Sequence, residues 1–429
     1  MMEENCRSSR RMIAVLVLSL ALFAASCSSS GENDLSDGTS TVPPTVNTSS
    51  PPDDSPIQGV LGASPGVLED RVVFGQSAAF SGPAKDLGNG MRLGIEAAFE
   101  EVNQSGGVHG RRLELVSFDD AYEPEAAIDN TLQLINSGGV FALIGAVGTP
   151  TSRSAVPVAT AGEIPYLAPF TGAAFLRDPQ QTIVFNLRAS YNQETEEMVD
   201  RLVTELGIER IAVMYQDDSF GQAGYNGARA ALDRRGMEAV SVGLYQRNTT
   251  AVKTGLLDLK QGDPQGVIVI GAYQPVAWLI RWARETGMDA VFVAISFVGS
   301  NALAQELGPD GAGVLTTQVV PFPTDASVSV VSSYLDALAA YHSQAVPGFV
   351  SLEGYLAGRL AIAGLESCGR TVDRECFSDR FASSEPIDID GFVMNFGEDD
   401  NQGSDQVFWT MIDENGDYRP LSDWQVMAP

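Results

Sequence analysis

From residue 71 onward, short apolar runs alternate with longer stretches whose apolar residues recur at helical spacing. After the first run, Ile95, Ala98, Phe99 and Val102 stand at positions i, i+3, i+4 and i+7, which predicts one buried face of a helix. The runs are nearly continuous in apolar residues, which is typical of strands covered by helices on both faces and therefore of parallel sheets. The predicted strands are residues 72–75, 113–118, 140–144, 164–167, 211–215, 266–271 and 290–295.

The first 26 residues have the pattern of a secretory signal peptide. Basic residues precede an apolar run at 12–25, which is shorter than the roughly 20 residues that a membrane span needs. The sequence AASC at 24–27 resembles the lipobox of bacterial lipoproteins, which implies cleavage before Cys27 and a lipid on its sulfur. Ordinary cleavage that leaves an idle cysteine is the alternative. We expect a secreted protein, lipid-anchored at the outer face of the plasma membrane.

The amino-acid composition predicts a flexible linker near the N-terminus and argues against nucleic acid as a partner. Residues 27–69 are rich in Ser, Thr, Pro, Gly and Asp and predict a disordered linker behind the lipidated Cys27. The formal net charge of −29 argues against nucleic acid as a partner, because phosphate contacts need clustered Lys and Arg. The hydrophobic content of 44% is sufficient for large cores, and 429 residues suit two lobes of ordinary size.

The most informative segment is residues 71–120. Its small polar and glycine-rich turns, in this order and spacing, are Ser81-Gly82-Pro83, Gly88, Gly94, the turn at 106–111 and Asp119-Asp120. The segment resembles the opening of the periplasmic binding proteins that serve leucine/isoleucine/valine-type ABC importers. The resemblance continues through IGAVGTPTSRSAVPVA, IPYLAPFTGA, RIAVMYQDDSFGQAG, VIVIGAY and VAISFVGSNAL, and covers about 350 residues.

This resemblance implies an α/β fold of two Rossmann-like lobes with parallel sheets, joined by a three-crossover hinge. The crossovers are expected near residues 187–190, 317–321 and 391–402. Lobe 1 would comprise residues 70–188 plus 318–395, and lobe 2 residues 189–317 plus 396–429. Ligands in open α/β sheets bind beyond the carboxyl ends of the strands, so both lobes would contribute to one cleft. An ABC permease in the plasma membrane and a small-molecule ligand are the implied partners.

A helix start after the strand at 140–144 predicts a carboxylate site. Thr149 is expected as the N-cap with Pro150 at the first helical position, which leaves the N–H groups of Thr151 and Ser152 facing the cleft. The resemblance implies that this turn holds the ligand's α-carboxylate, and that the turn Phe170-Thr171-Gly172 binds carboxylate and ammonium together. A cap that serves only its own helix is the alternative.

The resemblance also implies that bulky side chains line the cleft. Phe220 and Tyr273 align with cleft tyrosines of the family, and Tyr191 lies just past the first crossover. Leu87 stands where leucine-type binders have a tyrosine. An aromatic side chain at a strand end is often only part of the core, and this alternative stays open.

One position departs from the family pattern. Amino-acid binders have an acidic residue after the strand at 290–295, and Phe297 takes its place here. A buried ammonium without an anion is unfavourable by several kcal/mol. Either Asp218 or Glu353 supplies the charge, or the ligand is an aliphatic or aromatic carboxylate or an amide.

Other chemistry finds little support in the sequence. The glycines at 88–94 have the wrong spacing for a dinucleotide motif, no Ser/His/Asp or Cys/His set can be assembled, and residues 413–417 lack the pattern of a calcium loop. We expect no enzyme activity, no cofactor and no metal. Cys368 and Cys376 are expected to form a local disulfide, a metal site being the alternative. A ligand-sensing receptor module of the same fold is the alternative function.

Overall fold

The computed structural model describes residues 64–422, except 138, together with residue 424. The predicted signal peptide, Cys27 and most of the predicted linker lie outside these residues. The described part contains a 5-stranded sheet, a 7-stranded sheet and a 2-stranded hairpin. We call the elements around the first sheet the first lobe, and those around the second sheet the second lobe.

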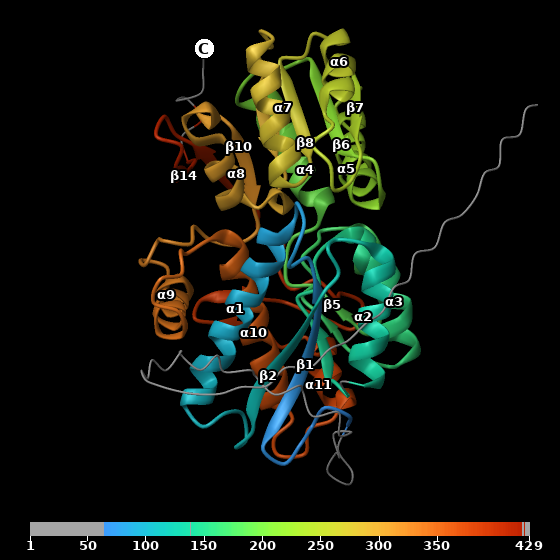
Figure 1. Cartoon of the computed structure of the whole chain (residues 1–429), viewed down its shortest axis with the longest axis vertical. Coiled ribbons are helices and arrows are strands. Elements are labelled where there is room, and N and C mark those ends of the chain that lie inside the picture. Colours follow the sequence, from blue (N-terminus) through green and yellow to red (C-terminus); the bar gives the residue numbers. More distant parts are fainter. Residues whose placement is uncertain (1–63, 138, 423, 425–429) are drawn as a thin grey trace, which may run out of the picture. The chain divides into compact units, whose positions relative to one another are not determined.

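The first sheet is entirely parallel, in the order β2-β1-β3-β4-β5. Its strands are β1 (Arg71–Ala78), β2 (Arg112–Asp119), β3 (Ala142–Ile144), β4 (Tyr166–Leu167) and β5 (Val184–Phe185). Helices cover both faces, with α1 and α10 on one side and α2 and α3 on the other (Figure 1). The elements of this lobe are α1 (Lys85–Gln104), α2 (Pro124–Asn136), α3 (Thr149–Ala161), η1 (Ala174–Arg177), α9 (Ser329–Tyr341), α10 (Phe349–Ser367), α11 (Arg374–Ala382), β11 (Ile387–Ile389) and β12 (Phe392–Met394).

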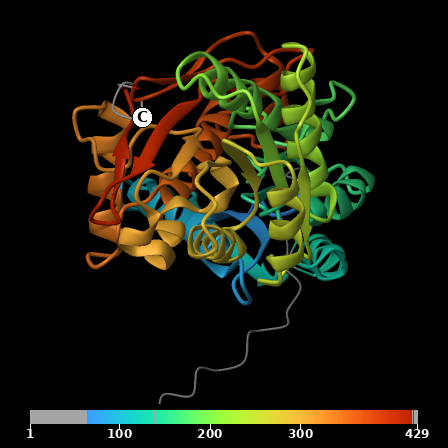
Figure 2. The same cartoon turned by 90° about the horizontal axis from the view of Figure 1, so that it is seen from above.

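The second sheet has the order β14-β13-β10-β9-β8-β6-β7. Its strands are β6 (Ile211–Gln216), β7 (Val242–Tyr245), β8 (Gly266–Ile270), β9 (Val291–Ala294), β10 (Leu315–Gln318), β13 (Phe408–Ile412) and β14 (Tyr418–Pro420). The accompanying helices are α4 (Tyr191–Thr204), α5 (Ser219–Asp233), α6 (Lys253–Gln261), α7 (Tyr273–Glu285), η2 (Ser296–Val298), α8 (Ser300–Leu307) and η3 (Gly308–Gly311). The red strands β13 and β14 extend the sheet at the edge next to β10 (Figure 2).

The parallel fold predicted from the apolar runs is therefore confirmed for the core of both sheets. The antiparallel pairs β10–β13 and β13–β14 were not predicted. In β13 two of five residues are buried, and in β14 none is, so these strands lack the fully buried pattern of the inner strands. The turn at 413–417 joins β13 to β14, as expected of a strand-connecting turn.

Helices α1 and α10 are in backbone contact because glycines face each other between them. A Cβ on Gly94 would lie 1.9 Å from the carbonyl oxygen of Ser351, and one on Gly354 would lie 2.3 Å from that of Met91. A disulfide joins Cys368 at the end of α10 to Cys376 in α11, with the two Cα atoms 5.7 Å apart. These contacts attach the returning chain firmly to the first lobe.

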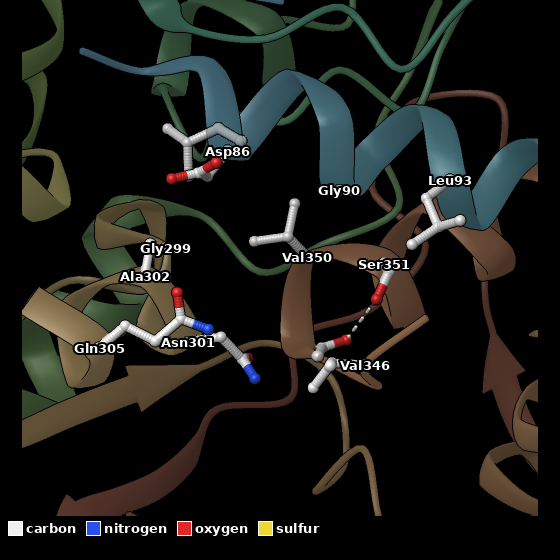
Figure 3. Close-up of a pocket in the computed structure, with 12 residues that line it drawn as sticks. Asp86, Gly90, Leu93, Gly299, Asn301, Ala302, Gln305, Val346, Val350 and Ser351 are labelled. Atoms are coloured by element: carbon white, nitrogen blue, oxygen red, sulfur yellow. Dashed lines mark hydrogen bonds between the residues drawn. The ribbon is translucent and has the colours of Figure 1, made fainter. Parts of the chain in front are cut away.

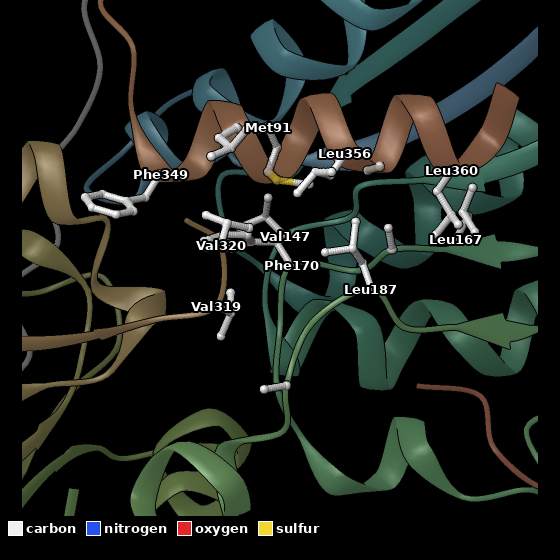
Figure 4. Close-up of a cluster of buried hydrophobic side chains, with 14 of the residues drawn as sticks. Met91, Val147, Leu167, Phe170, Leu187, Val319, Val320, Phe349, Leu356 and Leu360 are labelled. Carbon is white, nitrogen blue, oxygen red and sulfur yellow. The ribbon is translucent and has the colours of Figure 1, made fainter. Parts of the chain in front are cut away.

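The chain passes between the two sheets at residues 186–190, 319–328 and 395–407. Apolar residues at the first two crossings, Leu187, Val319 and Val320, join Phe170 and Val147 in one buried cluster beneath α10 (Figure 4). The crossings are thus packed into the core rather than exposed, which fixes where the two sheets can pivot.

Candidate functional site

The most conspicuous feature between the lobes is a group of five buried aromatic rings, which we call the aromatic seam. The first lobe contributes Tyr122 and Phe170, and the second contributes Tyr191, Phe220 and Phe297. Each of these side chains is at most 1% exposed. The rings lie on turns that follow β2, β4, β6 and β9, or on the first residue of α4, so the carboxyl ends of strands from both sheets converge here.

Phe297 is the centre of the seam. Its ring centroid lies 4.4 Å from that of Phe220 in its own lobe, and 5.4 Å and 5.9 Å from those of Phe170 and Tyr122 in the other lobe. Tyr191 extends the group, 5.5 Å from Phe220. The predicted residues Phe170, Tyr191, Phe220 and Phe297 are therefore brought together, and aromatic contact across the lobes is made at the position where the family pattern has an acid.

Hydroxyl groups adjoin the seam. Thr149 and Thr171 share a hydrogen bond of 2.6 Å between their Oγ1 atoms. The backbone N–H of Tyr191 donates to the carbonyl of Gly172 at 2.7 Å, and a Cβ on Gly172 would lie 2.5 Å from the Tyr191 ring. Burial raises the pKa of Tyr191 to about 12, so its hydroxyl keeps its proton and can donate. The predicted residues Thr149, Thr171, Gly172 and Tyr191 thus form one polar group.

The predicted start of α3 was wrong by one residue. The N-cap is Gly148, whose φ of 104° favours glycine, and Thr149 is the first helical residue. A Cβ on Gly148 would meet the Tyr122 ring at 2.2 Å, so this position must be small for a second reason. The prediction that the Ser152 N–H is free was also wrong, because it donates to the carbonyl of Gly148 at 3.1 Å.

The side chains of the next two residues turn into their own lobe. Thr151 Oγ1 donates to the carbonyls of Val147 and Gly148, and Ser152 Oγ accepts from the hydroxyl of Tyr166 at 3.2 Å. Neither hydroxyl is directed to the seam by these bonds. Of the predicted carboxylate turn, Thr149 is the residue whose hydroxyl meets the other polar groups of the seam.

A buried charge cluster lies next to the aromatic seam. Arg188, fully buried, has Glu194 and Glu353 each at 3.6 Å from its guanidinium nitrogens, and its Cζ lies 4.8 Å from the Phe170 ring centroid. We call Arg188, Glu194 and Glu353 the hinge charge cluster. Arg188 belongs to the first crossing, Glu194 to α4 and Glu353 to α10. The cluster therefore ties both lobes to the hinge.

Glu194 is the best-satisfied member of this cluster. Its carboxylate accepts from the Ser296 N–H at 3.0 Å, from Ser296 Oγ at 2.9 Å and from Thr317 Oγ1 at 2.6 Å. Glu353 has the Arg188 ion pair, and burial, opposed by the charge of Arg188, raises its pKa to about 7. The two carboxylates therefore differ in the number of hydrogen bonds that they accept.

The structure does not favour Asp218 as the missing anion. Its carboxylate caps α5 by accepting from the N–H groups of Phe220 at 2.9 Å and Gly221 at 3.3 Å. It also accepts from Gln216 at 2.6 Å and lies 3.4 Å from Arg247. These groups already satisfy Asp218 within its own lobe, which counts against the suggestion that it neutralises a ligand ammonium.

Two predicted residues, Leu87 and Tyr273, lie at a different place. A Cβ on Gly299 would meet Leu87 at 2.5 Å and Tyr273 at 3.6 Å, so both side chains pack around this glycine. Leu87 also lines a cavity of about 180 Å³ between α1, the start of α8 and the start of α10 (Figure 3). Its other walls are Asp86, Gly90, Leu93, Gly299, Asn301, Ala302, Gln305, Val346, Gly348, Val350 and Ser351.

At the rim of the seam, polar side chains connect the lobes. Arg247 pairs with Glu123 at 2.7 Å, and Asn248 donates to the same carboxylate at 2.7 Å and to the carbonyl of Ala121 at 3.2 Å. These bonds run from the segment after β7 to the segment after β2. The rim is therefore held by exposed or half-exposed polar contacts, unlike the seam.

Sequence reasoning missed Tyr122, Arg188 and Glu194. Tyr122 directly follows Asp119-Asp120, which marked a strand end, and Arg188 interrupts an apolar stretch at the predicted first crossing. Those positions were available signals. The sequence could not show that Arg188 meets the carboxylate of Glu353, which lies 165 positions further along the chain.

Other classes of site find no support in the described part of the chain. Residues 64–137, 139–422 and 424 contain no group of three or more His, Cys, Asp or Glu side chains placed to hold a metal ion. No helix within these residues is sufficiently long and apolar to cross a membrane.

Comparisons with known proteins agree with this geometry. A family model of periplasmic binding proteins matches residues 71–417. The leucine-, isoleucine-, valine-, threonine-, and alanine-binding protein of Pseudomonas aeruginosa is 24% identical over 307 residues, covering 72% of this chain and 81% of that protein.

Solved structures extend the likeness. A possible leucine/isoleucine/valine-binding protein from Rhodopirellula baltica is 38% identical, with a TM-score of 0.78 over 83% of this chain and 97% of that one. A fatty acid ABC transporter substrate-binding protein from Thermomonospora curvata, 20% identical with a TM-score of 0.75 over 84% and 93% of the two chains, shares the fold. The chain belongs to the extracytoplasmic periplasmic binding protein family, and within it to the leucine/isoleucine/valine-binding type.

Proposed function

We propose that this chain is the substrate-binding lipoprotein of an ABC importer, and that it captures an amino acid or a related small carboxylate or amide between two closing lobes. The observation that carries the proposal is the aromatic seam, where rings from both sheets meet beside the hydroxyls of Thr149, Thr171 and Tyr191. A ligand that contacts both sides stabilises the closed arrangement through its differential affinity, which is how a hinge switch signals occupancy.

The binding residues in this proposal are those of the seam and its polar group, and the predicted Leu87 and Tyr273 lie apart from them, around Gly299. The lobe boundaries remain as predicted, residues 70–188 plus 318–395 and residues 189–317 plus 396–429. The family supports an extracytoplasmic location, and the anchor on Cys27 is the part of the proposal that rests on sequence. An ABC permease would receive the ligand from the closed form.

A ligand screen by thermal shift tests the binding function. The purified mature chain is heated with amino acids, short-chain acids, aromatic acids and amides, and a ligand at 100 times its Kd should stabilise the folded state by about 2.7 kcal/mol. Thr171→Val should reduce the shift, whereas Thr160→Val, on the exposed side of α3, should not. No stabilisation by any class would contradict the proposal.

Membrane fractionation tests the anchor. The full-length protein, expressed in a bacterium that processes lipoproteins, should partition with membranes, and Cys27→Ala should release it to the soluble fraction. Cys6→Ala, inside the predicted signal peptide, is the matched control and should stay with the membranes. Full membrane retention of Cys27→Ala would show that the anchor is elsewhere.

A further inference from the structure

The aromatic seam restricts the shape of a ligand that enters between the lobes. Entry must separate Phe170 and Tyr122 from Phe297, because these rings are in contact across the boundary. The ring planes are inclined by 36° for Phe170 with Phe297 and by 34° for Tyr122 with Phe297. Both pairs are therefore tilted, neither parallel nor perpendicular. A flat apolar group can restore contact on both sides, with the offset stacking that aromatic rings prefer.

Unpaired hydrogen-bond donors beside the aromatic seam favour a ligand whose flat apolar group carries an anionic end. Tyr191 Oη and Arg188 Nε are buried and have no hydrogen-bond partner among the residues that the structure describes, whereas Arg188 Nη1 lies 3.6 Å from the carboxylate of Glu353. Helix α3, 13 residues long, begins next to Tyr122 without a side-chain cap. Buried donors without acceptors are unfavourable. A ligand acceptor that reaches them therefore contributes more binding free energy than it would at the protein surface.

No carboxylate at the seam is available for an ammonium group, among the residues that the structure describes. Glu194 is satisfied by Ser296, Thr317 and the ion pair with Arg188. Asp218 is satisfied by the start of α5 and by Gln216, and Glu353 already faces Arg188. The buried Asp120 accepts from Ser77 Oγ at 2.8 Å and from the Tyr122 N–H at 2.9 Å. A ligand ammonium would therefore lie beside aromatic rings and near a fixed guanidinium, which is unfavourable.

We propose that the seam binds a monocarboxylate carried on a single aromatic ring, and that it discriminates against α-amino acids. The inference rests on the proposed function, since it names the ligand class of the same cleft. The ring replaces the contacts of Phe297 with Phe170 and Tyr122. The carboxylate accepts from Tyr191, from Thr149 or Thr171, and from Nε of Arg188.

Calorimetric titration of the purified chain with matched ligands tests this assignment. Benzoate should bind at least about tenfold more tightly than cyclohexanecarboxylate, which is similar in size but not flat, and more tightly than benzamide, which lacks the charge. 3-Phenylpropanoate should bind at least about a hundredfold more tightly than phenylalanine, because the two differ by one ammonium group.

The outcomes separate the two proposals. Binding of leucine or phenylalanine at least as tight as that of benzoate would overturn the assignment of ligand class and leave the binding function standing. Absence of binding by every aromatic acid, aliphatic acid, amide and amino acid would overturn both. Preference for benzoate over the other ligands supports both.

A pair of substitutions locates the effect at the seam. Phe297→Leu removes the central ring and should weaken benzoate binding by about tenfold or more while changing its ratio to cyclohexanecarboxylate toward one. Phe292→Leu removes a similarly buried ring from β9 of the same lobe and should leave both affinities unchanged. Equal weakening by the two substitutions would overturn the assignment, since it would show a general effect on the second lobe.

Discussion

The aromatic seam and the hinge charge cluster are adjacent and similarly buried, yet they join the two lobes in opposite ways. The seam is built from tilted rings that contact each other across the boundary, so the lobes can separate there and a ligand can take the place of the facing ring. The hinge charge cluster joins Arg188 at the first crossing to acids on α4 and α10, and Glu194 also holds Thr317 near the second crossing.

The difference follows from what can replace each interaction when the lobes move apart. Apolar surface that is uncovered at the seam can be covered again by the apolar surface of a ligand, because the hydrophobic effect is not directional. A buried charge that is separated from its partner has no such substitute, and the separation is strongly destabilising. We infer that the charge cluster stays intact as a pivot while the seam opens.

The largest expected effect is that of Arg188→Met, which leaves Glu194 and Glu353 buried without a cation. The free energy of unfolding, measured in urea, should fall by about 3–5 kcal/mol. Arg210→Met is the control, because Arg210 pairs with Asp263 at the surface and its removal should change stability by less than about 1 kcal/mol. A decrease below about 1 kcal/mol in Arg188→Met would contradict the pivot.

The next largest effect is a pH dependence of the free energy of unfolding that arises from Glu353. Its pKa is raised from 4.5 to about 7 by burial, against Arg188 and Arg177 and with Glu194 nearby. The folded state therefore binds the Glu353 proton more tightly than the unfolded state. The stabilisation that this proton gives to the folded state is fully present below about pH 4.5 and is lost as the pH rises to about 7. Its size is about 1.4 kcal/mol per unit of pKa shift.

Glu353→Gln removes this contribution. Urea unfolding at several pH values from about 4.5 to about 7.5 should show that the difference between wild type and Glu353→Gln changes across this window, with the wild type losing stability as the pH rises. Glu385→Gln, at an exposed position, should follow the wild type at every pH. Parallel curves for the wild type and Glu353→Gln would contradict the raised pKa.

A smaller effect concerns ligand choice at the seam. Phe297→Glu restores an acid at the position where the family's amino-acid binders have one. It should improve leucine affinity by about tenfold in calorimetry, because the carboxylate would neutralise the ligand ammonium. Phe292→Glu lies on β9 away from the seam and should give no gain. Unchanged leucine affinity in Phe297→Glu would show that this position does not set specificity.

The smallest effect is expected at the rim. Arg247→Gln removes the half-exposed ion pair with Glu123 and should change stability by less than about 1 kcal/mol while raising the ligand dissociation rate a few-fold, more at low salt than at high salt. Arg234→Gln breaks a pair with Glu196 inside the second lobe and should leave the dissociation rate unchanged. An equal change of rate in both would argue against a role for the rim in closure.

Part of this site followed from local sequence. Phe170, Phe220 and Phe297 follow apolar runs, and the ends of parallel strands gather at one edge of a sheet, so their meeting was foreseeable once the fold was inferred. The cap of α3 was misplaced because both Gly148 and Thr149 are acceptable caps by residue type. The positive φ of Gly148 and the closeness of Tyr122 decided between them.

The sequence by itself determined the alternation of strands and helices and the family, because these depend on residue type and order along the chain. Only the tertiary structure decided that Phe297 packs against rings of the other lobe, that Asp218 is already satisfied, and that Arg188 meets Glu353. Those facts depend on which distant segments come together, and the packing of two whole sheets sets that.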